Sequence, residues 1–400
     1  MTADDADRRA RLALMLAAEP GNARLLELVE EDGAAFVEQR LRSGHLNGPG
    51  LAPVAERLAA GLDIATQDRM AATAGARLLC PGDEEWPAAL DVLAEVTDGE
   101  GQGGRPLGLW VRGGALGTLG PAVAVVGSRA ATDYGAWMAA DLAADLAGLG
   151  VAVVSGGAYG IDGHAHRGAL VAGGVTVAVL ACGVDVAYPR QHEPLLERIV
   201  SSGGVLVSEA PMGATARRNR FLVRNRLIAA LALGTVVVEA AARSGALNTA
   251  NWADRCSRPT FAVPGPVASA LSAGTHRLVR ERGAVLVTSA ADVLEDLGLA
   301  NAGADTDESR QPTLLVGRVP ELSPNASQVL AVMQRSGAVD VAALSRGSGL
   351  AVSEILATVA ELALAGLANS DGAGYRVTSA GQQSSAHSRT AVPGSGGRTT

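Results

Sequence analysis

The amino-acid sequence predicts an α/β protein whose central domain is a doubly wound parallel sheet, with a helical domain before it and a winged-helix-like domain after it. The chain has 400 residues, which at about 100–200 residues per domain allows two to four domains. Apolar runs of strand length alternate with helical stretches between residues 121 and 298. This alternation is typical of buried parallel strands joined by helices. Three helical stretches and a hairpin pattern follow near the C-terminus.

Residues 1–75 show short helical patterns separated by Gly, Pro or Asn, and they predict a small helical domain. The expected helices are Ala10–Ala18, Ala23–Val29, Gly33–Leu41 and Val54–Leu62. Residues 76–120 form an N-terminal extension of the central domain, which we assign to residues 76–298. Within this extension, Leu109–Val111 is predicted to be an edge strand.

The central domain carries the clearest pattern. Its predicted strands are Ala122–Val126, Val151–Val154, Val175–Leu180, Val205–Val207, Thr235–Val238 and Thr260–Val263. The predicted helices are Tyr134–Leu149, Gly160–Ala172, His192–Val200, Asn219–Leu233 and Leu247–Arg255. Each strand is short and almost wholly apolar, as expected for a sheet that is covered on both faces.

Beyond the central domain, residues 299–320 lack periodicity and are predicted to be a linker. Residues 321–379 are predicted to form the winged-helix-like domain, with helices at Ser323–Gln334, Val339–Gly347 and Val352–Ala365. A hairpin around Asp371 and Gly372 completes it. The third helix contains two Glu and no Arg, so we expect a structural or protein-contact role for this domain. Residues 380–400 are rich in Ser, Gly, Thr and Arg and are predicted to be disordered.

Composition excludes several classes of protein. No apolar run approaches the roughly 20 residues of a membrane span, and the first ten residues are too acidic for a signal peptide, so we expect a cytoplasmic protein. The three cysteines are far apart, which favours reduced thiols over disulfides or a zinc site. All 33 residues in the Lys+Arg count are Arg, so a Walker A loop is excluded. We expect no cofactor and no metal.

The net charge of −8 is unevenly distributed. Residues 121–300 contain 15 Arg and 14 acidic residues, which gives this section a net charge of +1 (15 − 14). Within it, five arginines surround Phe221 and Asn225: Arg217, Arg218, Arg220, Arg224 and Arg226. Such a run is usually a solvated helix face. Here Arg224 to Arg226 are expected to begin a helix, where cations oppose the helix dipole unless an anion compensates.

Two sources of compensation for these arginines remain open. A bound polyanion could cross the helix N-terminus, and Phe221 could then stack on a base. Alternatively, Glu209 or Glu239 could pair with Arg224 or Arg226 inside the protein.

Three Gly-containing loops follow predicted strands and are candidates for anion binding. They are Gly127-Ser128-Arg129, the stretch from Ser155, Gly156 and Gly157 to Gly160, and Ala242-Arg243-Ser244-Gly245. Glycine allows a phosphate to approach backbone N–H groups, Ser adds a short donor, and Arg adds a fixed charge. The alternative is that each glycine serves only a tight turn. None of the loops matches the dinucleotide fingerprint G-x-G-x-x-G.

Asp162, His164 and His166 could suggest a catalytic or metal site. Two histidines two residues apart on a helix point to different faces, so a shared metal is not expected. We interpret Asp162 as an N-cap or first-turn acid and His166 as a hydrogen-bonded packing residue.

Ordered motifs from Pro121 to Gly265 resemble the DNA-processing protein family DprA, also called Smf. The principal motifs are PAVAVVGSR (121–129), SGGAYGIDGHAH (155–166), FLVRNRLI (221–228), VEAAARSGALNTA (238–250) and FAVPG (261–265). The resemblance implies an extended Rossmann-like fold, an N-terminal SAM-like domain and a C-terminal winged-helix-like domain.

The resemblance also implies a function. Such a protein binds single-stranded DNA without sequence preference, forms a homodimer, and loads a RecA-type recombinase during natural transformation, without being an enzyme. With the loops above, it gives the residues expected to contact DNA: Gly127, Ser128, Arg129, Ser155, Gly156, Gly157, Phe221, Arg224, Asn225, Arg226, Arg243, Ser244 and Gly245.

Two rival functions are weighed against this one. The Gly loops and Glu239 distantly resemble Rossmann-like phosphoribohydrolases, in which Glu239 would be the catalytic acid, although their Gly-Gly-x-Gly-Thr loop is missing before Leu247. The other rival is an assembly scaffold in which the loops have no ligand.

Overall fold

The computed structural model divides the chain into two compact units, Met1–Ala304 and Asp305–Thr400. The described residues are 5–99, 101–299, 324–336 and 339–377, except 353, 356–357, 360–361, 363–366 and 371–374. The division falls within the predicted linker. Most of that linker and the whole predicted tail lie outside the described residues.

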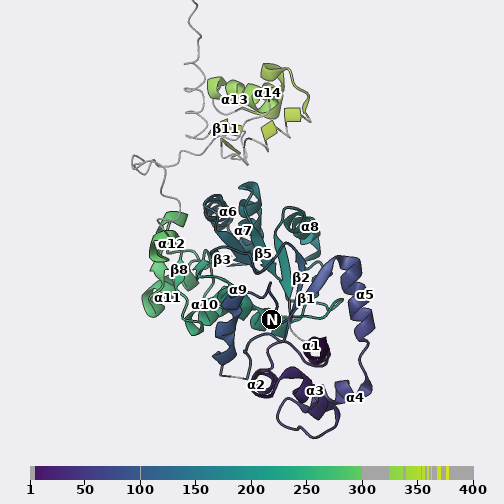
Figure 1. The fold of residues 1–400 in the computed structure, drawn as a ribbon. Coiled ribbons are helices and arrows are strands. Elements are labelled where there is room, and N and C mark those ends of the chain that lie inside the picture. The colour runs from purple at the N-terminus through teal and green to yellow at the C-terminus, as the bar shows by residue number, and fades with distance from the viewer. Residues whose placement is uncertain are drawn as a thin grey trace, which may run out of the picture. The chain divides into compact units, whose positions relative to one another are not determined.

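A nine-stranded sheet forms the centre of the first unit (Figure 1), in the order β1-β2-β6-β5-β4-β3-β7-β8-β9. The strands are β1 (Ala76–Leu79), β2 (Leu109–Gly113), β3 (Ala122–Val126), β4 (Ala152–Ser155), β5 (Thr176–Val179), β6 (Val205–Ser208), β7 (Gly234–Val237), β8 (Thr260–Ala262) and β9 (Val285–Leu286). From β6 to β9 all neighbours pair in parallel. The strands β1 and β2 are antiparallel additions. The predicted α/β sheet is therefore confirmed.

Helices cover both faces of the parallel part of the sheet. In β3, Val123 and Val125 pack with α6 and α7, whereas Ala124 and Val126 pack with α9 and α10. Both faces are buried, which explains why the strand sequences are continuously apolar. The helices are α6 (Asp133–Gly148), α7 (Ile161–Val171), α8 (Glu193–Ser201), α9 (Arg218–Leu231), α10 (Gly245–Arg255), α11 (Ala273–Arg282) and α12 (Ala290–Asp296).

The antiparallel edge differs from the prediction. The strand β2 is not at the edge, because β1 pairs with it on one side and β6 on the other. The sequence ARLL of β1 lies only partly buried, so it lacks the apolar run that made the other strands recognisable.

The N-terminal helices pack onto this edge of the sheet. They are α1 (Asp5–Ala17), α2 (Ala23–Asp32), α3 (Ala34–Arg42), α4 (Ala52–Ala60) and α5 (Ile64–Ala74). Leu14 of α1 and Leu25 of α2 belong to the same apolar cluster as Trp110 of β2 and Leu195 of α8. The described residues of this predicted domain, 5–75, are helical as expected, but they share a core with the sheet and do not form a compact unit of their own.

The second unit contains α13 (Pro324–Ser336), α14 (Val341–Ser348) and the antiparallel pair β10 (Ala368–Ser370) and β11 (Tyr375–Val377). These elements match two of the three predicted helices and the two arms of the predicted hairpin. Part of the third predicted helix and the hairpin turn at Asp371 and Gly372 lie outside the described residues. Among all described residues, no helix is long and apolar enough to cross a membrane.

Candidate functional site

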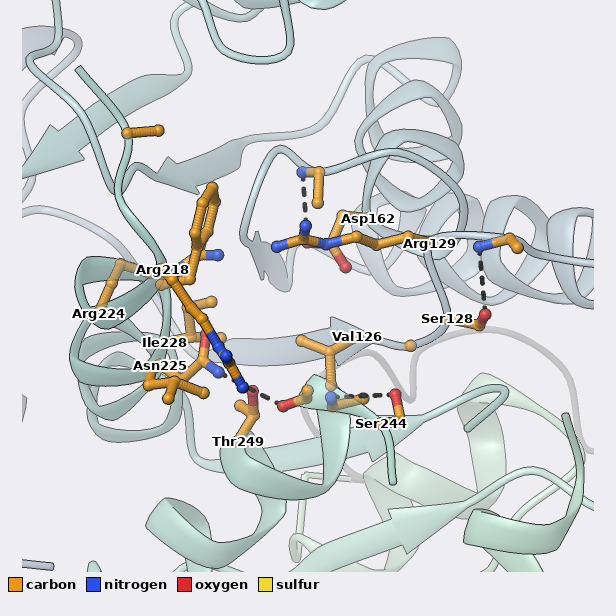
Figure 2. A pocket seen from close by; sticks show the side chains of 18 of the residues that line it. Val126, Ser128, Arg129, Asp162, Arg218, Arg224, Asn225, Ile228, Ser244 and Thr249 are labelled. Carbon is orange, nitrogen blue, oxygen red and sulfur yellow. Dashed lines mark hydrogen bonds between the residues drawn. The ribbon is translucent and has the colours of Figure 1, made fainter. Parts of the chain in front are cut away.

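A cleft of about 670 Å³ lies at the carboxyl ends of the parallel strands. The chain runs from β3 outward through β4 and β5 to β6, and then returns to place β7 on the other side of β3. The loops after β3 and β7 therefore diverge at this point, where open α/β sheets characteristically bind ligands. The cleft lies at this topological switch point, between the loop after β3 and helices α9 and α10 (Figure 2).

Eight of the thirteen predicted contact residues line the cleft: Gly127, Ser128, Arg129, Phe221, Arg224, Asn225, Ser244 and Gly245. They come from three separate segments of the sequence. The structure therefore brings together the first loop, the arginine-rich helix and the start of α10.

The loop after β3 is held rigidly at the cleft wall. The Ser128 backbone N–H donates to the carbonyl oxygen of Glu239 (2.7 Å), and the Ser128 hydroxyl oxygen accepts from the N–H of Ala130 (3.2 Å). A Cβ at Gly127 would lie 2.9 Å from the Glu239 carbonyl oxygen, so no larger residue fits there without movement. Arg129 follows this fixed turn with an exposed side chain that extends into the cleft (Figure 2).

The N-terminus of α10 forms another part of the wall. The Ser244 hydroxyl oxygen accepts from the N–H of Ala246 (3.3 Å) as an N-cap. The Asn225 amide of α9 donates to Asn248 Oδ1 (3.1 Å) and to the Gly245 carbonyl oxygen (3.4 Å), which joins the two helices. The partial positive charge of the α10 N-terminus therefore faces the cleft, as in many anion sites.

Arg224 lies at the cleft wall but is buried. Its guanidinium donates to the carbonyl oxygens of Gly156 (2.8 Å) and Val179. Burial lowers the pKa of Arg224 to about 10, against the opposing effect of Asp162, so the side chain stays charged at neutral pH. Burial raises the pKa of Asp162, and the positive charge of Arg224 partly offsets this increase. Arg224 thus supplies a fixed positive charge, whereas the exposed Arg129 and Arg218 can follow a ligand.

Aromatic rings lie beside these cations. The Arg129 guanidinium carbon is 4.6 Å from the centroid of the Phe221 ring, within the range of a cation–π contact. The rings of Tyr188 and Phe221 are 5.5 Å apart between centroids and tilted by 51°. Tyr188 also lines the cleft, and its side chain is 45% exposed. The cleft therefore combines positive charge with aromatic surface.

Three predicted contact residues support the cleft from behind. The Ser155 hydroxyl is buried and donates to the Val125 carbonyl oxygen (2.7 Å). The carbonyl oxygens of Gly156 and Gly157 bind Arg224 and His192 respectively. None of the three is among the residues that line the cleft. Arg243, also predicted, is exposed on the loop before α10 but does not line the cleft either.

Arg226 requires a correction. Its side chain is 0% exposed, pairs with Glu209 (Nη2 to Oε1, 2.7 Å) and donates from Nε to the Gly104 carbonyl oxygen (3.0 Å). The internal pairing considered above is therefore the one found for Arg226. The reason is helix position: α9 begins at Arg218, so Arg226 lies in its interior and faces the core.

The Asp162 and His166 interpretations agree with the structure. Asp162 lies in the first turn of α7, whose N-cap residue is Gly160. His166 is buried, and its Nδ1 lies 2.7 Å from the Thr176 hydroxyl. In the described part of the chain, no group of three or more His, Cys, Asp or Glu is arranged to hold a metal.

Among the cleft residues missing from the prediction are Arg218, a further exposed cation, and Tyr188, a further aromatic ring. Arg218 was visible in the sequence as a member of the arginine run. Tyr188 comes from the loop after β5, and nothing in its local pattern distinguishes it from a packing residue. Only the folded arrangement places it against Phe221.

The family model described as "DNA recombination-mediator protein A" matches residues 77–298, more than half of the chain. The chain belongs to the DprA/Smf family. It is 45% identical over 386 residues to a DprA protein of Mycobacterium tuberculosis, covering 94% of this chain and 96% of the relative. It is 39% identical over 249 residues to protein Smf of Escherichia coli, covering 61% and 64% respectively.

A solved structure gives the same result. The X-ray structure of DNA processing protein A from Streptococcus pneumoniae matches with a TM-score of 0.60 and 31% identity, over 74% of this chain and 99% of that one. The Rossmann-like fold expected from the resemblance is thus supported for the first unit.

The family model describes a recombination mediator, and the relatives are named for DNA processing. The rival hydrolase interpretation assigned catalysis to Glu239. That side chain is 3% exposed, and it accepts hydrogen bonds from the backbone N–H (2.9 Å) and hydroxyl of Thr132. Glu239 therefore holds the entry to α6 and does not line the cleft.

Proposed function

We propose that the cleft binds single-stranded DNA without sequence preference, and that the bound strand is passed to a RecA-type recombinase during DNA uptake and natural transformation in the cytoplasm. The carrying observation is that the exposed Arg129 and Arg218, the fixed charge of Arg224 and the N-terminus of α10 converge on one cleft beside Phe221. Backbone amides and guanidinium groups bind phosphates of any sequence, whereas an aromatic ring offers stacking to unpaired bases.

The family supports the same assignment, because its name describes recombination mediation and the relatives are named for DNA processing. We further propose that the protein acts as a homodimer. The helices before the sheet are proposed to be a SAM-like domain and the second unit a winged-helix-like domain. Two helices followed by an antiparallel strand pair in the second unit support the latter.

The test is fluorescence anisotropy of labelled single-stranded and double-stranded oligonucleotides at several salt concentrations. Arg218→Ala should weaken binding to all sequences alike. It should reduce the slope of log K against log salt by about 0.7, the value for one phosphate on a single strand. Arg198→Ala is the matched control. Arg198 is exposed near the end of α8, at the amino ends of the parallel strands, whereas the cleft lies at their carboxyl ends.

Equal affinity of the Arg218 variant and the wild type at low salt would reject the proposed site. Loading is tested separately, by adding the protein to a RecA-type recombinase on single strands covered by a single-strand-binding protein. The wild type should shorten the lag before filament assembly. An unchanged lag with intact strand binding would reject the loading role alone.

A further inference from the structure

The Phe221 ring is covered in the structure by the group that a DNA phosphate would attract. Arg129 lies over the ring at 4.6 Å, and Tyr188 approaches it at 5.5 Å. The Arg224 guanidinium carbon lies 6.0 Å from the ring centroid. A nucleobase stacking on Phe221 therefore needs one of these neighbours to leave.

Of the two cations beside the ring, Arg129 is the one that can leave. Arg224 is buried and held by the carbonyl oxygens of Gly156 and Val179. Arg129 is exposed, and among the described residues its guanidinium makes no hydrogen bond or ion pair. Two interactions hold it there, the contact with the ring and the charge attraction of Asp162, and neither is a hydrogen bond.

A phosphate offers this guanidinium a stronger partner than the ring does. Two charge-assisted hydrogen bonds to phosphate exceed one exposed cation–π contact. Once Arg129 turns to a phosphate, the face of Phe221 is open for a base, and base stacking replaces the lost contact. In a duplex the bases are paired and stacked on one another, so the opened ring would stay without a partner.

We propose that Arg129 and an unpaired nucleobase exchange on the face of Phe221, and that this exchange makes the cleft selective for single strands over duplexes. The inference rests on the proposed function, because it needs DNA in the cleft. It goes further by assigning strand selectivity to one contact. Arg129 then contributes in two opposite ways, since it attracts phosphate but also blocks the stacking position until phosphate is bound.

The experiment compares two ligands of equal length and charge, an oligo-dT and an abasic oligomer of roughly 20 nucleotides, a length that spans one binding site. Anisotropy at low salt gives Kd for each ligand with the full-length protein. The quantity of interest is the base-dependence ratio, Kd of the abasic oligomer divided by Kd of oligo-dT. We expect it to exceed 1 in the wild type and to fall to about 1 in Phe221→Leu.

The decisive variant is Arg129→Ala. It should weaken binding to both ligands, because a phosphate contact is lost. It should nevertheless raise the base-dependence ratio by about two- to fivefold, because in the wild type Arg129 can return to the ring in the abasic complex but is displaced by the base of oligo-dT, and the variant has no such contact to lose. Arg218→Ala is the matched control: it removes another exposed arginine of the cleft, one that contacts no aromatic ring of the described residues, and it should leave the ratio unchanged. In the Phe221→Leu background, Arg129→Ala should also leave the ratio unchanged.

The outcomes separate the inference from the function. A ratio in Arg129→Ala equal to or below that of the wild type overturns the exchange, while strand binding stands. A wild-type ratio of 1 also overturns it. Failure of the wild-type protein to bind either ligand rejects the proposed function itself. Duplex affinity supplies a second readout, because Phe221→Leu should reduce the preference for single strands but leave duplex binding unchanged.

Discussion

At the scale of single residues, the cleft depends on positions where no larger side chain fits. Gly156 is the clearest of these, since a Cβ there would lie 2.6 Å from Asp162 Oδ2 and closer still to the Arg224 guanidinium. Its carbonyl oxygen is also an acceptor for Arg224. Because Gly156 has no side chain, the buried Arg224 guanidinium can reach the wall of the cleft.

Gly156→Ala should destabilise the first unit by about 1–3 kcal/mol, the usual cost of forcing extra atoms into a packed site. It should also weaken oligonucleotide binding, because Arg224 must shift. The control is Gly148→Ala at the end of α6, where nothing lies within 4 Å of the added Cβ and alanine should be neutral or slightly stabilising. Thermal unfolding and anisotropy measure both effects. Identical melting temperatures for Gly156→Ala and the wild type would contradict the packing argument.

At the scale of elements, α9 connects the cleft to the N-terminal helices. The carboxylate of Glu19 binds Arg220 through two contacts (2.7 and 3.0 Å) and lies 3.5 Å from Arg217. The first turn of α9 contains no acid, and the side chain of its N-cap residue, Arg217, makes no capping hydrogen bond to the helix. Glu19 therefore supplies the negative charge that the N-terminal end of this helix lacks.

Glu19→Gln should lower stability by at most about 1 kcal/mol, because the pair is partly exposed. Burial raises the pKa of Glu19, but the hydrogen bond and charge of Arg220, with Arg217 and Arg57, outweigh it, so the pKa is lowered overall. A carboxyl whose pKa is lowered by folding stabilises the fold at pH values above its ordinary, unfolded-state pKa. This stabilisation is lost as the pH falls through the folded-state pKa.

The melting temperatures of wild type and Glu19→Gln should accordingly differ at neutral pH and converge in acid. Glu27→Gln serves as control, since its pair with Arg24 lies on the exposed surface of α2 and should contribute little. A difference that persists unchanged into acid would show that the ion pair is not its cause.

At the scale of the whole molecule, the proposed binding site lies entirely within the first unit. Every residue that lines the cleft falls between 126 and 249, and the unit has its own apolar clusters on both faces of the sheet. The second unit has a separate cluster that includes Val329, Leu344 and Leu367. Each unit therefore has the core that independent folding requires.

Deleting residues 305–400 should leave both the melting temperature of the first unit and its affinity for oligo-dT unchanged within about twofold, because no cleft contact is removed. Differential scanning calorimetry and anisotropy test this with the two proteins in parallel. A large loss of affinity in the shortened chain would assign part of the binding surface to the second unit.

The α/β class and most strands and helices of the sheet could be predicted from the sequence, because strands buried on both faces must be continuously apolar. It also pointed to loops that meet at the cleft, since Gly exposes backbone N–H groups to an anion and Ser and Arg add a donor and a charge. The strand β1 was not predicted, because a partly buried antiparallel strand has no continuous apolar run in its sequence.

The different roles of the arginines between residues 217 and 226 could be assigned only from the folded arrangement. Arg218 is exposed at the cleft, Arg220 pairs with Glu19, Arg224 is buried at the cleft wall, and Arg226 pairs with Glu209 in the core. These four residues are chemically identical, and their neighbours in the chain are similar. What separates them is the direction in which each projects from α9 and which distant segment packs there, and neither is encoded in local sequence.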